Sequence, residues 1–221
     1  MKEILILGAI IGIVIIGAVV GSKYYNSSTE TTRTAAPGVS EAMVRPDSPT
    51  VGPADAKVTV VEFLDPECES CAAFGPTVKK LQKDYDPKVR LVIRYMPLHP
   101  NSVPAATFLE AAGEQGKFWQ ALELLFEKQP EWGTVHGAPA SAPKPDVPKL
   151  LEQYTMQLGL DVNKFTEALK QNKYSAKLER DRRDGQTLGV RQTPTIFVNG
   201  RRLMRLDGAE LKSMIDQELA K

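Results

Sequence analysis

Hydrophobic residues are concentrated at the beginning of the chain. Residues 4–21 consist only of isoleucine, leucine, valine, alanine and glycine. As a helix, this run would span about 27 Å, which is close to the roughly 30 Å hydrocarbon core of a bilayer. We expect a transmembrane signal anchor over residues 4–21, with residues 1–3 in the cytoplasm and the rest of the chain exported. A cleaved signal peptide is the alternative, although the run is longer than the usual core of one and no small-residue cleavage site follows it.

A polar segment follows this hydrophobic run. Residues 22–53 are rich in serine, threonine, glycine and proline and show no hydrophobic periodicity, which is typical of flexible linkers. We therefore expect a flexible linker over residues 22–53 and a folded domain over residues 54–221. A domain of that length can bury a hydrophobic core without further cross-links.

The first part of the expected domain alternates between strand and helix patterns. Residues 57–64 (KVTVVEFL) are rich in valine and phenylalanine, which predicts a buried strand. Residues 68–84 place their hydrophobic side chains on one face of a helix, and residues 88–96 (KVRLVIRYM) predict a second strand. A strand, a helix and a strand in this order form a βαβ unit with parallel strands and a right-handed crossover.

A long helical region and a short hairpin complete the pattern. Several stretches within residues 101–190 repeat hydrophobic residues every three or four positions, which predicts an inserted helical subdomain. These stretches are 105–112, 118–128, 147–158, 162–171 and 174–188. The strand pattern TIFV at 195–198, the Asn-Gly turn at 199–200 and the amphipathic residues 209–220 predict a hairpin followed by a helix. The order β-α-β and then β-β-α indicates an α/β fold around a mixed sheet.

Composition and charge exclude several classes of protein. The chain is 42% hydrophobic and 25% charged, which is ordinary for a globular protein. Its net charge of +1 argues against a strongly basic nucleic-acid-binding protein, and we expect no nucleic-acid partner. The chain has two cysteines, which is too few for a disulfide-rich scaffold or for a zinc site built from cysteines alone.

The two cysteines, Cys68 and Cys71, form a C-x-x-C motif after the first expected strand. Cys68 should begin the following helix, where free backbone amides and the helix dipole lower the pKa of a thiol. Cys71 lies one turn later and can attack a mixed disulfide on Cys68. We therefore expect an exposed nucleophile at Cys68 and a buried resolving thiol at Cys71. The pair could instead be half of a metal site, but this is less favoured because His99 and His136 do not have the spacing of zinc ligands. It could also form a purely structural disulfide, but a disulfide across so small a loop would stabilise the fold little.

Two further features are candidates for the same site. Glu62 interrupts the hydrophobic strand six residues before Cys68. A buried carboxyl there would have a raised pKa and could accept a proton from Cys71; the alternative is a residue at the end of the strand that reaches solvent. Thr193 and Pro194 precede the third expected strand, and a cis bond between them would present the backbone of Thr193 to a substrate peptide.

Four segments of the chain resemble the DsbA-like branch of the thioredoxin superfamily. They are VEFLDPECESC, RYMPLHPNS, GKFWQALELLF and GVRQTPTIFVNG. The resemblance covers most of residues 54–221 and implies a thioredoxin fold with an inserted helical subdomain, a cis bond before Pro194, and thiol-disulfide exchange on protein substrates outside the cytoplasm. It also implies that Glu62 is the family's buried acid and that Thr193 is the residue before the cis-proline. It implies no metal and no cofactor other than the redox-active cysteine pair.

The residues around the cysteines differ from those of that family. DsbA-type oxidases usually carry a proline-containing pair between the cysteines, whereas this chain has Glu69 and Ser70, and Glu67 comes directly before Cys68. Two carboxylates beside a thiolate oppose the helix dipole, so we expect a Cys68 pKa above about 5 and a less oxidising disulfide. His99 follows the second strand, and either a redox or a packing role fits it. The sequence leaves the direction of electron transfer open.

These observations predict a membrane-anchored thiol-disulfide oxidoreductase that acts on proteins, in disulfide formation or isomerisation. We expect a single-pass protein of a bacterial-type cell membrane, with its catalytic domain in the periplasm or outside the cell. Its redox partner would be a separate membrane protein, because this chain has no second C-x-x-C motif. The alternatives are a redox-inert thioredoxin-fold chaperone or assembly factor and, less favoured, a metal chaperone that uses the two thiols.

Overall fold

The computed structural model describes residues 38–134, 139 and 144–221. Among these residues, a five-stranded sheet has the order β1-β3-β2-β4-β5. The strands are β1 (Thr50–Val51), β2 (Val58–Leu64), β3 (Val89–Tyr95), β4 (Thr195–Val198) and β5 (Arg201–Arg202). β2 and β3 run parallel and the other neighbouring pairs run antiparallel, so the sheet is mixed.

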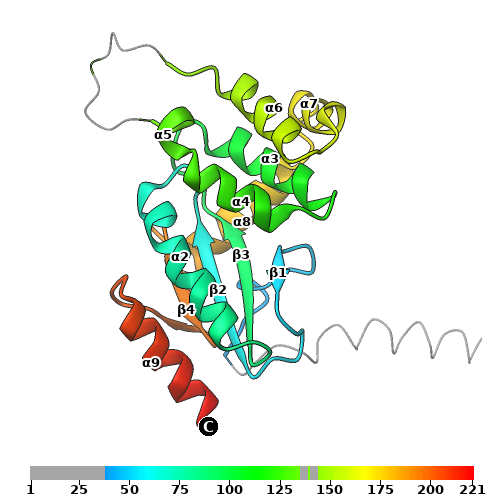
Figure 1. Cartoon of the computed structure of the whole chain (residues 1–221). Helices are drawn as coiled ribbons and strands as arrows, with labels where there is room; N and C mark the ends of the chain where they lie inside the picture. Colours follow the sequence, from blue (N-terminus) through cyan, green and yellow to red (C-terminus); the bar gives the residue numbers. More distant parts are fainter. Residues whose placement is uncertain (1–37, 135–138, 140–143) are drawn as a thin grey trace, which may run out of the picture. The chain divides into compact units, whose positions relative to one another are not determined.

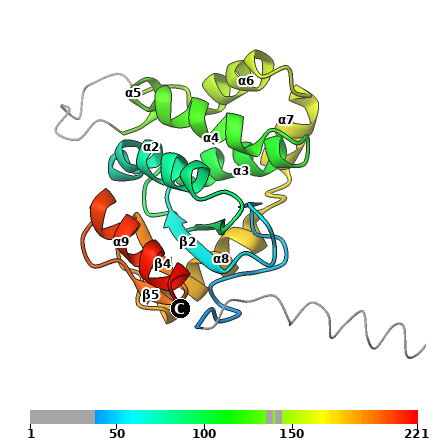
Figure 2. The ribbon, with the colours of Figure 1, turned by 60° about the horizontal axis from the view of Figure 1, so that its bottom comes forward.

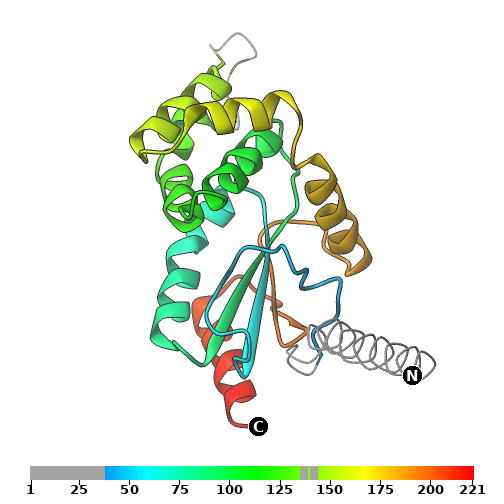
Figure 3. The same ribbon diagram turned by 90° about the vertical axis from the view of Figure 1, so that its right-hand side faces the viewer.

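Helices cover both faces of this sheet (Figure 1). α2 (Glu69–Asp84) and α9 (Gly208–Leu219) pack on one face, and α8 (Ser175–Thr187) lies on the other (Figure 3). α8 approaches the sheet closely at Gly185, where a Cβ would lie 3.1 Å from the ring of Phe63 and would be tightly packed. Since β2 is covered on both faces, all of its residues are buried, which explains why its sequence is almost continuously hydrophobic.

A helical subdomain stands at the end of the sheet where β2 and β3 terminate (Figure 1). Its helices are α3 (Ser102–Gly113), α4 (Phe118–Glu127), α5 (Gln129–Trp132), α6 (Val147–Gln157) and α7 (Val162–Lys170). α3 packs against α4, α6 and α7, and Phe108 of α3 contacts Phe165 of α7 edge to face, with 5.9 Å between the ring centroids. α4 also packs against α2 (Figure 2), which joins the subdomain to the helix that carries the cysteines.

The arrangement confirms the predicted thioredoxin fold, with β-α-β followed by β-β-α and a helical insert between them. α8 departs from the expectation that residues 101–190 form the insert, because this helix packs against β3. Hydrophobic spacing identifies a helix but not the surface that covers it. The insert is therefore α3 to α7, and α8 is a helix of the central layers.

The expected linker boundary at residue 53 is wrong for the described part of that segment. Met43 is buried in the same hydrophobic cluster as Phe63, and β1 pairs with β3 through Thr50 and Val51. Residues 38–53 therefore belong to the folded domain. The segment has no strand or helix periodicity, because only two of its residues adopt strand geometry and the others form turns and irregular structure.

The expected transmembrane anchor over residues 4–21 lies outside the described residues, as do residues 1–3 and the linker up to residue 37. Within the described ranges, no helix has the length and hydrophobicity needed to cross a bilayer. The anchor stays a prediction from the hydrophobic run.

A buried ion cluster attaches the residues before β1 to the domain. The guanidinium of Arg94, which is fully buried in β3, donates hydrogen bonds to Asp181 at 2.8 Å and to Asp184 at 2.6 Å. It also donates to the carbonyl oxygen of Ala42 at 2.6 Å. Asp184 in turn accepts two bonds of 2.9 Å from Arg45. The cluster thus joins β3, α8 and the segment that we expected to be a linker.

Replacing Asp181→Ala should lower the free energy of unfolding by at least about 3 kcal/mol, because it removes a buried partner of the Arg94 guanidinium. Urea-induced unfolding followed by circular dichroism measures this change. Glu179→Ala is the matched control on the same helix: its ion pair with Arg182 is partly exposed, so we expect a loss below about 1 kcal/mol. Equal losses for both variants would show that the buried cluster does not stabilise the fold.

Candidate active site

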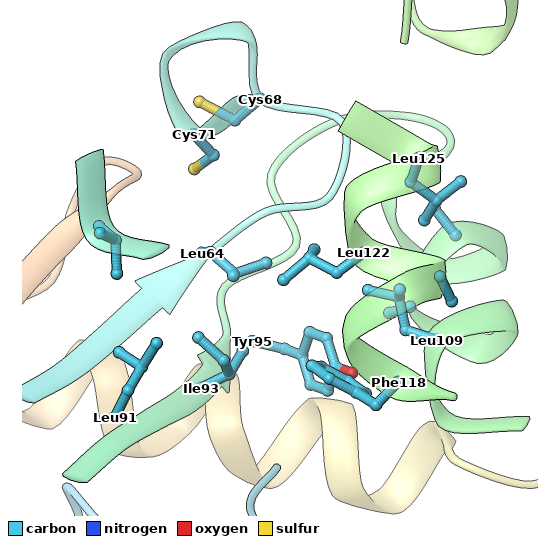
Figure 4. Packing of buried hydrophobic residues seen from close by; sticks show 14 of the residues in the cluster. Leu64, Cys68, Cys71, Leu91, Ile93, Tyr95, Leu109, Phe118, Leu122 and Leu125 are labelled. Carbon is cyan, nitrogen blue, oxygen red and sulfur yellow. The ribbon is translucent and has the colours of Figure 1, made fainter. Parts of the chain in front are cut away.

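The two cysteines lie at the beginning of α2, directly after the central strand β2. Cys68 is the N-cap residue of α2 and Cys71 lies in its first turn, as Figure 4 shows. Both are free thiols. Cys68 keeps 8% of its surface exposed, whereas Cys71 has none. The predicted placement at the helix start is therefore confirmed. The expectation that Cys68 is exposed is wrong, because this residue packs into the hydrophobic core cluster and is buried, although it is nearer to solvent than Cys71.

The surroundings of the two thiols shift their pKa values in opposite directions. A hydrogen bond from the Cys71 side chain is the largest influence on Cys68 and, although burial opposes it, the pKa of Cys68 falls to about 5. The Thr193 side chain and the backbone amides of Cys71 and Ser70 add to this decrease. Burial raises the pKa of Cys71 well above the usual range, and the charges of Cys68 and Glu62 raise it further. Cys68 is thus the thiolate of the pair at neutral pH.

Glu62 lies in the middle of the sheet, next to this pair. It pairs with Ile93 of β3 on one side and with Ile196 of β4 on the other, so it is not a strand-end residue that reaches solvent. It is 3% exposed, and burial, followed by the charge of Cys68, raises its pKa to about 8. A carboxyl in this state holds a proton at neutral pH and can exchange it with a neighbouring thiol.

Thr193 and Pro194 approach Cys68 from the loop before β4. The peptide bond between them is cis, as the resemblance implies. In its protonated form, the Sγ of Cys68 donates a hydrogen bond to the Thr193 carbonyl oxygen at 3.2 Å. This contact brings together residues that are 125 positions apart in the chain and places the loop before β4 beside the reactive sulfur.

Asp65 is a site residue that the sequence reasoning did not identify. Its fully buried carboxylate accepts hydrogen bonds from the backbone amides of Glu67, Leu98 and His99, and it contacts Nδ1 of His99 at 2.7 Å. Burial alone would lower the pKa of His99, but the hydrogen bond and charge of Asp65, with a further contribution from Cys68, raise it. An acidic residue at the end of a buried strand, directly before a proline, is the signal that could have indicated Asp65.

Glu67 does not face the thiolate in the way that its place in the sequence suggested. Its buried carboxylate accepts hydrogen bonds from the backbone and side chain of Asn101 and from the backbone and hydroxyl of Thr134. Its charge is therefore compensated by donors of the insert. Glu69 and Ser70 are exposed at the start of α2, so Glu69 is the flanking carboxylate that solvent screens.

The described residues include no group of three or more histidine, cysteine, aspartate and glutamate side chains that could hold a metal ion. His136, which the sequence analysis considered as a ligand, lies outside them. The arrangement can instead do thiol chemistry: it contains an acidic thiol, a buried partner thiol in hydrogen-bond contact, and a proton-holding carboxyl below them.

The comparisons with known proteins agree with this geometry. The family model described as thioredoxin matches residues 45–217. The crystal structure of oxidised BdbD from Bacillus subtilis is 28% identical, covers 85% of this chain and 99% of that chain, and superposes with a TM-score of 0.70. A thioredoxin-like oxidoreductase from Silicibacter pomeroyi is 25% identical over 83% of this chain and 99% of that chain, with a TM-score of 0.67.

The curated relatives carry a different name. The Na(+)/H(+) antiporter NhaA of Herminiimonas arsenicoxydans is 36% identical over 69% of this chain and 22% of its own length. NhaA 3 of Salinispora tropica is 38% identical over 76% of this chain and 24% of its own length. The chain thus spans about a quarter of the length of these relatives, and their name describes proteins that extend far beyond the matched part.

Replacing Cys71→Ala should raise the pKa of Cys68 by about one unit or more, because it removes the hydrogen bond with the largest effect on that thiol. The ultraviolet absorbance of the thiolate, followed against pH, measures the pKa. Ser70→Ala is the matched control, since Ser70 acts on Cys68 through its backbone amide, which the substitution keeps. A pKa that is unchanged in Cys71→Ala would contradict this account of the site.

Glu62 should also make the stability of the protein depend on pH. Its carboxyl titrates at about 8 in the folded protein, against 4.5 for an unperturbed glutamate, so the folded state binds this proton more tightly. The resulting stabilisation is fully present below pH 4.5 and is lost as the pH rises through about 8. Relative to the unaltered protein, Glu62→Gln should gain up to about 4 kcal/mol in unfolding free energy across this range. Urea-induced unfolding at a series of pH values measures the difference, and parallel pH profiles of the two proteins would refute the prediction.

Proposed function

The chain belongs to the thioredoxin family, and on that premise we propose that it is a thiol-disulfide oxidoreductase that exchanges disulfides with protein substrates. The observation that carries the proposal is the opposite shift of the two thiol pKa values at the start of α2. One thiol is ready to act as nucleophile and leaving group, while the other stays protonated until it is needed. The structural similarity to an oxidoreductase from Silicibacter pomeroyi supports the same class of activity.

In the oxidising direction, a substrate thiolate attacks Sγ of Cys68 in the disulfide form. The bond between the two cysteines breaks, a mixed disulfide forms, and Cys71 leaves as a thiolate that takes the proton of Glu62. A second substrate thiolate then attacks the substrate sulfur of the mixed disulfide, and Cys68 leaves as a stable thiolate. The substrate is oxidised by two electrons and the cysteine pair is reduced by two.

The pKa of Cys68 favours this direction over reduction. Because the pKa of Cys68 is about 5, its thiolate is stable at neutral pH. A stable thiolate stabilises the reduced form of the pair and makes its disulfide more oxidising. The hydrogen bonds that Glu67 accepts from Asn101 and Thr134 compensate part of a charge that would otherwise act against the thiolate. We therefore propose disulfide formation as the main activity, with isomerisation as the reverse attack of Cys68 on incorrect disulfides.

A substrate peptide would bind along the loop that carries the cis-proline. Thr193 stands beside Cys68 and precedes β4, so an extended peptide can pair with its backbone as an added strand. We place this reaction outside the cytoplasm, with residues 4–21 as the membrane anchor and a separate membrane protein that reoxidises the cysteines. The hydrophobic run at the start of the chain supports that location.

Substitution of each cysteine tests the proposed function. Cys68→Ala should abolish both the oxidative refolding of a reduced disulfide-containing protein and the reduction of insulin, because it removes the nucleophile. Cys71→Ala should lose turnover but accumulate mixed disulfides at Cys68, which non-reducing gel electrophoresis detects. The unaltered protein should oxidise the thiols of the reduced protein faster than it reduces the disulfides of insulin. A Cys68→Ala variant that retains activity would refute the proposal and favour a redox-inert binding protein.

A further inference from the structure

A cavity of about 590 Å³ lies between α2, α4 and the sheet. Its volume falls within the range of small-molecule binding sites, roughly 300 to 1,000 Å³. Most of its wall is apolar, with contributions from β1, β3, α2 and α4, and its lining includes Val51, Leu91, Ile93, Leu122 and Phe126. Figure 4 shows three of these side chains, Leu91 and Ile93 on β3 and Leu122 on α4.

Glu62 is the buried polar side chain in this lining. It is 3% exposed, and no hydrogen bond or ion pair joins its carboxyl to another described residue, but its oxygens are not fully enclosed by protein and border the cavity. An unpaired polar group in such surroundings costs free energy unless something pairs with it. The cavity is the space from which a partner for this carboxyl can come.

We propose that the cavity binds an uncharged, largely apolar small molecule whose carbonyl oxygen accepts a hydrogen bond from the protonated carboxyl of Glu62. The apolar wall matches the body of such a molecule. A protonated carboxylic acid in an apolar site is a hydrogen-bond donor. The ligand would therefore provide a hydrogen-bond partner for the buried carboxyl in this wall.

The charges around the cavity favour an uncharged ligand over an ion. Lys79 of α2 and Glu123 of α4 both line the cavity and pair with each other at 2.7 Å, so the local cation is already compensated. Glu127 adds a negative charge to the lining, which disfavours an anion. A cation would need Glu62 ionised, and burying a charged pair in an apolar cavity costs more than burying a neutral hydrogen bond.

Few other groups can titrate close to Glu62. β3 and β4 place Ile93 and Ile196 opposite it. The titratable groups that α2 and α4 contribute around it are Cys68, Cys71, Lys79, Glu123 and Glu127. Since burial is the main cause of the raised pKa of Glu62, at about 8, the hydrogen-bond donor should be lost as the pH passes that value.

Occupation of the cavity would also affect the cysteines, an effect that rests on the proposed function. Glu62 supplies or accepts the proton of Cys71 during exchange. A ligand that accepts a hydrogen bond from Glu62 keeps the proton on Glu62. Glu62 can then no longer accept the proton of Cys71. Bound ligand should therefore slow thiol-disulfide exchange through the group below the cysteines, without covering Cys68.

Prodan, an uncharged fluorescent naphthyl ketone, is a suitable probe, because its emission shifts to the blue in an apolar site. The unaltered protein should bind it saturably at neutral pH, and the affinity should fall about tenfold once the pH is well above 8, where the hydrogen bond is lost. Glu62→Gln keeps a donor that cannot ionise, so its affinity should be constant over the same pH range. Glu62→Leu should bind about tenfold more weakly than the unaltered protein at neutral pH.

A cavity-filling substitution provides the steric test. Val51→Trp should abolish prodan binding, whereas Met204→Trp, at a position that is 80% exposed and outside the cavity, should not change it. Circular dichroism checks that each variant is folded. Three results would each overturn the proposal. They are a lack of saturable binding by the unaltered protein, an affinity that rises with pH, and the same pH profile for Glu62→Gln as for the unaltered protein.

Two measurements separate this inference from the proposed function. Prodan binding to Cys68→Ala needs no thiol chemistry, so it should persist even if the protein proves not to be an oxidoreductase. Where exchange is active, saturating prodan should slow it in the unaltered protein and leave the residual rate of Glu62→Gln unchanged. Equal slowing of both proteins would overturn the link between the cavity and the cysteines.

Discussion

The carboxylate of Asp65 holds together the loops from which the site is built. It is fully buried and accepts hydrogen bonds from three backbone amides in two separate segments, in addition to its contact with His99. β2 and β3 are parallel, so the loops that follow them leave the sheet at the same edge. One of these loops leads into Cys68 and the other leads into the insert. Without this shared acceptor, the amides of Glu67 and Leu98 would lose these hydrogen bonds, whereas the amide of His99 would keep its bond to the hydroxyl of Ser102.

Beside that junction, the fold brings together three buried ionisable groups with different preferred charge states. Cys68 receives hydrogen bonds that stabilise its thiolate, whereas Cys71 and Glu62 are surrounded by apolar side chains that destabilise their charged forms. The negative charge of the site therefore resides on the outermost sulfur and the proton resides below it. This order follows from the position of β2 at the centre of the sheet, because a carboxyl in an edge strand would reach water and lose its raised pKa.

The sequence predicted those parts of the fold that depend on neighbouring residues. The strands around Val61 and Val92, the cysteine pair and the turn at Asn199 all have local patterns, and each lies where it was expected. The orientation of Glu67 could not be predicted, because the hydroxyl that binds it belongs to Thr134, 67 positions later. The attachment of residues 38–53 was also missed, since a partly buried salt bridge between Arg45 and Asp184 gives no hydrophobic periodicity.

The insert affects the cysteine pair in two ways, through the charge of Glu67 and through the burial of Glu62. Asn101 and Thr134 bind the carboxylate of Glu67 and so compensate a charge that would otherwise oppose the thiolate one residue away. α4 closes the apolar cavity against which Glu62 is buried, and this burial keeps the proton on Glu62 at neutral pH. Without these helices, Glu67 would lose the hydrogen bonds that it accepts from Asn101 and Thr134, and Glu62 would lose the α4 side of the cavity against which it is buried. The chemistry of the cysteine pair is therefore set jointly by the core that carries the thiols and by the insert that binds Glu67 and closes the cavity beside Glu62.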